Sequence, residues 1–188
     1  MLEVEPKFYC QRLAYYIPQA LVLVGCCLFY GLMAVENHNL PCTEEKEVHK
    51  VQSLLHSVLM LGFFINLVSL LVNAGVVPYF DVSQNLVRSK QRPGQAPIFD
   101  WRSSIYPYIS WLTIIMQGAH ICLAIFQLSL INGHSPCFKA ADSESGSSSM
   151  TADGKRLFAL AIVQLLLVIV FSILKLRLSS IMELIGKR

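Results

Sequence analysis

Four long apolar segments contain no aspartate, glutamate, lysine or arginine, and they constrain the fold of this chain more than any other feature. The segments span residues 13–35, 51–77, 105–131 and 157–174. About 17–25 apolar residues in a helix cross a hydrocarbon core of about 30 Å, and each segment reaches that length. Because lipid offers no hydrogen-bond partners to the backbone, such segments must be helical. The sequence therefore predicts an all-α fold, a four-span transmembrane helical bundle.

The length of the chain leaves no room for a separate soluble domain. The four segments take up about half of the 188 residues, so we expect residues 1–188 to form a single transmembrane domain. A charged fraction of 14% and a hydrophobic fraction of 54% are typical of membrane proteins. The net charge of +3 is small, and no nucleic-acid partner is expected. Proton relays, voltage sensors and ion carriers usually need charge within the membrane, so the charge-free spans argue against those functions.

The basic residues divide unevenly among the segments outside the spans. Ten of the fifteen fall in the two tails and in the loop 78–104, and five fall in the loops 36–50 and 132–156. By the positive-inside rule, the termini and loop 78–104 are expected to be cytoplasmic and the other two loops exoplasmic. We therefore expect an integral, multi-pass protein of the plasma membrane or the endomembrane system. The ten residues are Lys7, Arg12, Arg88, Lys90, Arg92, Arg102, Lys175, Arg177, Lys187 and Arg188.

Each exoplasmic loop contains one cysteine, Cys42 in the first and Cys137 in the second. Exposed free thiols are reactive in an oxidising compartment, so this pattern predicts a disulfide between the two loops. Two free or separately modified thiols are the alternative. Cys10 precedes the first span on the cytoplasmic side and is a candidate for palmitoylation. The cysteines inside the spans are interpreted as small packing residues, and they are Cys26, Cys27 and Cys122.

The two halves of the sequence match when they are offset by 95 residues. Both copies read Cys-Leu, eight residues, Asn, three residues and Pro-Cys, beginning at Cys27 and at Cys122. The match indicates two related helical hairpins, and it places Cys42 and Cys137 at equivalent positions, which favours the bridge. The second exoplasmic loop also contains the serine-rich segment 143–149, whose composition predicts flexibility beyond Cys137.

The second span carries small and polar residues on one narrow stripe. Gly62, Asn66, Ser69 and Asn73 follow one another at spacings of four, three and four residues. Residues of these types let helices approach closely and hydrogen-bond across the interface. We therefore predict a helix-packing face, and the alternative is a polar pathway or a ligand contact.

Further polar candidates inside the spans are His56, Gln117, His120 and Gln127. A histidine within a membrane can transfer protons or bind a metal. No third ligand stands at a suitable spacing, so no metal site and no cofactor are expected. The preferred interpretation is neutral histidines and amides that hydrogen-bond inside the bundle.

No catalytic constellation is visible, and we expect a protein that is not an enzyme. The architecture resembles that of tetraspan proteins with both termini inside, such as the MARVEL-type family, and this topological resemblance implies no site residues. The predicted function is lateral association as an accessory subunit, scaffold or junction-type component, with the lipid bilayer and other membrane proteins or further copies of itself as partners. The alternative is a subunit of an oligomeric channel or small-solute transporter, and a membrane enzyme acting on lipids has the least support.

Overall fold

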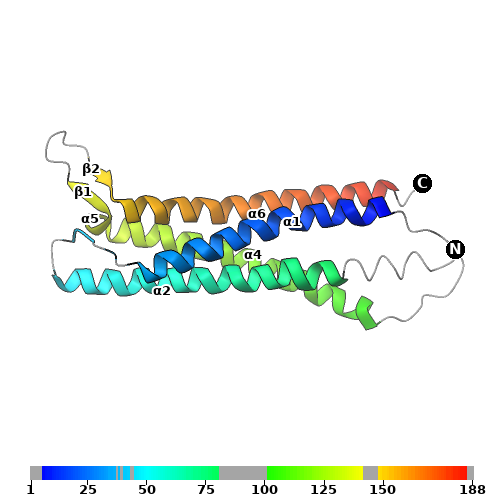
Figure 1. Ribbon diagram of the computed structural model, residues 1–188, viewed down its shortest axis with the longest axis horizontal. Helices are drawn as coiled ribbons and strands as arrows, with labels where there is room; N and C mark the ends of the chain where they lie inside the picture. The colour runs from blue at the N-terminus through cyan, green and yellow to red at the C-terminus, as the bar shows by residue number, and fades with distance from the viewer. Residues whose placement is uncertain are drawn as a thin grey trace, which may run out of the picture. The chain divides into compact units, whose positions relative to one another are not determined.

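The fold is built from long helices, with one short strand pair (Figure 1). The computed structural model describes residues 6–36, 38, 40–42, 45–80, 101–141 and 148–185. The long helices are α1 (Pro6–Val35), α2 (Glu45–Leu70), α4 (Trp101–Gly133) and α6 (Ala152–Ile185). A π-helical segment, η1 (Leu71–Val76), follows α2, and the helix then continues through Phe80. The short elements are α5 (Ser135–Phe138), β1 (Lys139–Ala141) and β2 (Ser148–Met150).

Three helical stretches of the described residues are long and apolar enough to cross a membrane. They are Tyr16–Val35, Glu47–Phe80 and Pro107–Gly133. These stretches correspond to the first three predicted spans, which are confirmed as helices of sufficient length and hydropathy to cross a membrane. The fourth predicted segment, residues 157–174, lies within helix α6.

The chain divides into two compact units. The first unit contains Met1–Leu28 and Phe64–Met116, and the second contains Phe29–Phe63 and Gln117–Arg188. In the first unit the buried apolar side chains include Leu23, Val72, Ile109 and Met116. In the second unit they include Tyr30, Leu55, Leu59, Leu123, Phe138 and Leu157.

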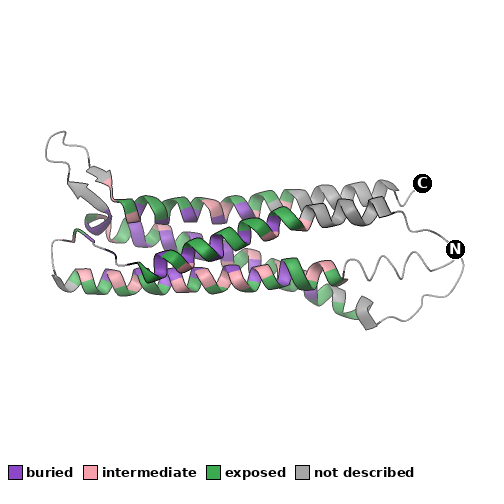
Figure 2. Ribbon diagram, in the orientation of Figure 1, coloured by how far each residue is buried: buried purple, intermediate pink, exposed green. Residues whose placement is uncertain are grey.

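Large apolar side chains are exposed along all four long helices, where green and purple residues alternate in Figure 2. Apolar side chains on the outer surface of a helix suit a hydrocarbon environment, whereas a soluble protein of this size rarely exposes so many. Examples are Leu21 and Leu32 of α1, Leu61 and Phe64 of α2, Ile125 and Phe126 of α4, and Leu166 and Ile173 of α6.

The segment between α4 and α6, residues 134–151, is structured where it is described, and we call it the Cys137 connection. Strands β1 and β2 pair in antiparallel register, with Lys139 opposite Met150 and Ala141 opposite Ser148. The N–H of Thr151 donates to the carbonyl of Phe138 at 2.8 Å, which closes the base of the hairpin. The strand pair was not predicted from the sequence, because backbone pairing does not need apolar side chains. Residues 142–147 lie outside the described part of the chain.

Helix α6 begins with a capped first turn. The hydroxyl oxygen of Thr151 accepts a hydrogen bond from the N–H of Gly154 at 3.2 Å, which is the usual pattern of an N-cap. Asp153 lies in the same turn, where the helix dipole stabilises a negative charge. This turn places a carboxylate at the start of α6.

Candidate functional site

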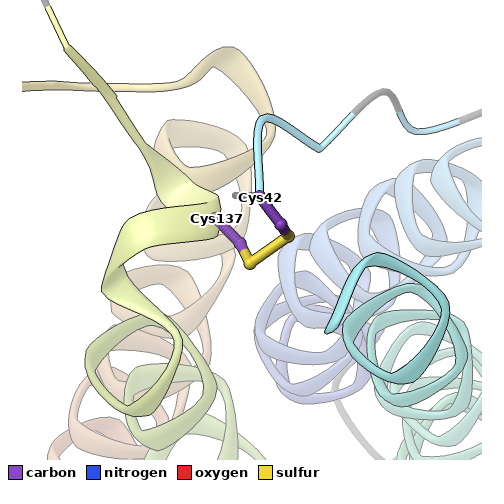
Figure 3. Close-up of a disulfide and its surroundings, with 2 residues drawn as sticks. All are labelled: Cys42 and Cys137. Carbon is purple, nitrogen blue, oxygen red and sulfur yellow. A yellow bond between two sulfur atoms is a disulfide. The ribbon is translucent and has the colours of Figure 1, made fainter. Parts of the chain in front are cut away.

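The cysteines of the two predicted exoplasmic loops lie at disulfide distance (Figure 3). The sulfur atoms of Cys42 and Cys137 are 2.08 Å apart and the Cα atoms 4.3 Å apart. Cys42 belongs to the segment between α1 and α2, residues 36–44, which we call the Cys42 connection. Cys137 is buried in α5. The proximity that the cysteine pattern predicted is thus confirmed.

The imidazole of His38 lies between the end of α1 and the start of α6, and it is buried. Its Nε2 atom is 2.8 Å from the carbonyl oxygen of Met33, and its Nδ1 atom is 3.1 Å from a carboxylate oxygen of Asp153. The side chains are exposed by only 6% for the histidine and 17% for the aspartate. Sequence reasoning missed this contact. An aspartate is typical of the first turn of a helix, so the sequence could have indicated that a helix starts near Asp153. Nothing in the sequence indicated that His38 would be its partner.

A second ionic contact lies on the surface beside His38. The guanidinium of Arg156 lies 2.8 Å from a carboxylate oxygen of Glu36, and both side chains are about half exposed. The same guanidinium nitrogen is 4.0 Å from Asp153. The Cys42 connection is therefore linked to the first turns of α6 by one buried and one exposed contact.

Within the second unit, polar side chains of the helices pair with each other. His120 of α4 and Gln164 of α6 are both buried, and the Nδ1 atom of the histidine hydrogen-bonds the amide oxygen of the glutamine. This arrangement agrees with the expected role of His120 as a histidine hydrogen-bonded inside the protein. Ala124 and Ala161 on the same two helices are fully buried, which is typical of closely packed helices.

Gln127 makes the second buried pair, with Tyr30 of α1. The amide nitrogen of Gln127 donates to the phenol oxygen of Tyr30, and neither residue is exposed. Among the described residues, the amide oxygen of Gln127 has no hydrogen-bond partner. Tyr30 was missed as a polar residue of the first span, although a phenol inside a charge-free segment needs a partner.

The other two intramembrane polar candidates lie apart from these pairs. The Nδ1 atom of His56 is 3.2 Å from the carbonyl oxygen of Ala34, and the histidine is exposed. Gln117 is half-buried on α4. In the described part of the chain, no group of three or more histidine, cysteine, aspartate or glutamate side chains could hold a metal ion.

The four residues of the predicted packing face are all buried within the single chain. In the second unit, a Cβ atom on Gly62 would lie 2.6 and 2.7 Å from two ring carbons of Tyr30, so the glycine allows the ring to lie against α2. In the first unit, the amide nitrogen of Asn73 donates to the carbonyl of Ser69 at 2.9 Å. Asn66 is fully buried. This burial supports packing inside the chain rather than a face that is free for a partner.

The remaining cysteines differ in their surroundings. Cys26 and Cys27 are buried, as small packing residues would be, whereas Cys122 is exposed on α4. Cys10 lies in α1, and its side chain is outside the described part of the structure.

A scan against protein-family models, a search of curated proteins and a search of solved structures found no match to this chain.

Proposed function

We propose that this protein is a non-enzymatic membrane protein that acts by lateral association, as an accessory subunit, scaffold or junction-type component. The proposal rests on the contrast between buried polar side chains and exposed apolar ones. The polar side chains Asn66, His120, Gln127 and Gln164 are buried, whereas the exposed surface of the helices is largely apolar. A protein with this distribution offers lipid-like helix faces to its neighbours and little chemistry of its own.

Helix α4 offers the best face for close approach of another helix. Gly118 and Cys122 are both exposed and stand one turn apart, and an added Cβ at Gly118 meets nothing within 4 Å. Small residues four positions apart let two helix backbones come close together in lipid. Exposed Ile121 and Ile125 flank the pair and would supply dispersion contacts. We therefore assign lateral association to this face of α4.

Three glycines allow a matched test of this assignment. Gly118→Leu should reduce the size of the native complex in mild detergent and leave the yield of folded monomer unchanged. Gly25→Leu is the control: Gly25 is exposed with open space around it, but bulky Phe29 follows one turn later. Gly62→Leu should instead lower the yield of folded protein, because it collides with Tyr30. An unchanged complex for Gly118→Leu would remove α4 from the proposal.

We also propose that α6 is the fourth span and that both termini and loop 78–104 are cytoplasmic. Exposed apolar residues such as Phe158, Ile162, Leu166 and Ile169 support the first point, and the distribution of basic residues supports the second. A membrane-impermeant thiol reagent tests the orientation on a variant in which the exposed native cysteine Cys122 is replaced. Ser89→Cys should remain unlabelled in intact cells and react after permeabilisation. Labelling in intact cells would reverse the topology.

An oligomeric channel or small-solute transporter is the second candidate. It is favoured by the buried amide oxygen of Gln127, which has no partner in the described residues and so could bind a water molecule or solute. Affinity purification followed by reconstitution into liposomes separates the two functions. A stoichiometric partner chain without ion or solute flux supports the accessory role, and a pure homo-oligomer that conducts supports the channel.

A further inference from the structure

The two ring nitrogens of His38 both face acceptors. Nε2 is 2.8 Å from a backbone carbonyl, that of Met33, and Nδ1 is 3.1 Å from the carboxylate of Asp153. A neutral imidazole has one donor and one acceptor nitrogen, so it can satisfy only one of these contacts. An imidazolium donates at both nitrogens. Because the ring is buried, water is poorly placed to replace a lost bond.

Charged side chains lie close to the His38 ring on α6 and on the Cys42 connection. Asp153 contacts the ring directly and Glu36 is two residues away, whereas Arg156 is the one basic group in the described ionic contacts, 4.0 Å from Asp153 and 2.8 Å from Glu36. Lys155, two residues after Asp153, is exposed and makes no ion pair in the described part of the chain, so the carboxylate of Asp153 is the charged group that contacts the ring. On the neighbouring elements, α5 contributes Cys137, which is paired with Cys42. In α2, the side chains of Glu47, His49 and Lys50 are exposed and make no ion pair in the described part of the chain.

We infer that His38 is a pH-sensitive latch, which ties the end of α1 to the start of α6 when its imidazole is protonated. Histidine is the side chain whose charge ordinarily changes between about pH 5 and 8. Protonation completes both contacts. Deprotonation removes one donor, so one of the two contacts is lost. The latch is thus closed at acidic pH and weakens as the pH rises through this range.

Protonated His38 can donate to both acceptors, whereas neutral His38 can donate to only one of them. The stabilisation from the latch is therefore fully present at the acidic end of the range and is lost towards the alkaline end.

Thermal unfolding of the purified full-length protein in detergent tests the latch at pH 5.5, 6.5 and 7.5. From pH 5.5 to 7.5, the Tm of the wild type should fall by about 3 °C more than the Tm of His38→Gln, since glutamine cannot become a double donor. His49→Gln is the matched control, because His49 is exposed in the neighbouring helix, and it should follow the wild type. The same pH profile for the wild type and His38→Gln would overturn the inference.

Nitrogen NMR of the wild type, labelled in its histidines, keeps the inference testable if His38→Gln does not fold. The signal of His38 can be assigned by replacing the other four histidines one at a time. Both ring nitrogens should carry protons at pH 5.5, and Asp153→Asn should move the midpoint of the titration to lower pH. A neutral ring at pH 5.5, or a midpoint unchanged by Asp153→Asn, would show that no latch exists.

Discussion

The two connections that meet at the cysteine pair are built in different ways. The Cys42 connection has no helix or strand where it is described, and a buried histidine side chain holds it through polar contacts to Met33 and Asp153. The Cys137 connection is folded on itself by backbone hydrogen bonds, and it buries Phe138 completely. The first therefore depends on a titratable side chain. The second depends on volume and backbone geometry, which do not change with pH.

This difference limits the similarity of the two sequence halves. The matched Pro-Cys elements end at cysteines that lie at disulfide distance from each other. The other matched cysteines, Cys27 of α1 and Cys122 of α4, have different surroundings, because Cys27 is buried and Cys122 is exposed. The sequence match thus indicates similar positions along the chain but does not predict similar packing.

The largest effect is expected when the apolar support of the Cys137 connection is removed. Phe138→Ala deletes a fully buried ring and should lower the free energy of unfolding by about 3–5 kcal/mol. Thermal unfolding in detergent measures this as a lower Tm, and the loss should be the same at pH 5.5 and 7.5. Phe158→Ala is the control, because Phe158 is 44% exposed, and its effect should be small. A loss that varied strongly with pH would contradict the distinction between the two connections.

Loss of the cysteine pair should have the next largest effect, because it releases both connections at once. The double variant Cys42→Ser and Cys137→Ser opens a loop of 95 residues and should cost about 2–4 kcal/mol, at the lower end if the membrane already restrains the helices. Non-reducing peptide mapping establishes the bridge, and Tm in detergent measures its contribution. Exposed Cys122→Ser is the control. Recovery of Cys42 and Cys137 as free thiols from freshly alkylated protein would refute the bridge.

The sequence predicted the features that depend on which residue types occur in each segment. The apolar segments indicated the spans, and the position of one cysteine in each exoplasmic loop indicated the pair. The boundaries were less accurate: α2 begins at Glu45 rather than at Val51, since a helix continues into water while its backbone bonds are satisfied. The contact of His38 with Asp153 could not be predicted, because neither periodicity nor spacing indicates which connection meets which helix start. The stripe at Gly62 indicated close packing, but not that Tyr30 was the neighbour.

A smaller effect is expected from added bulk where the Cys137 connection meets α6. A Cβ atom at Gly154 would lie 2.8 Å from Cγ of Met150 and 3.1 Å from the carbonyl oxygen of Phe138. The carbonyl belongs to the backbone bond that closes the hairpin, so it cannot easily move away. Gly154→Ala should therefore cost about 1–3 kcal/mol. Gly133→Ala is the matched control, because an added Cβ meets nothing within 4 Å there. Equal Tm values for the two variants would show that the hairpin base tolerates displacement.

The smallest effect should come from the exposed ion pair beside the Cys42 connection. Arg156 and Glu36 are 2.8 Å apart, but both side chains are about half exposed, and exposed pairs contribute only about 0–1 kcal/mol. Glu36→Gln should therefore change the Tm little, and any change should disappear at high salt because the pair is screened. His38→Gln at acidic pH should have the larger effect, since its contacts are buried. Measuring both variants at low and high salt separates the two contacts. If Glu36→Gln were the more damaging of the two, the exposed pair and not the buried histidine would hold the Cys42 connection to α6.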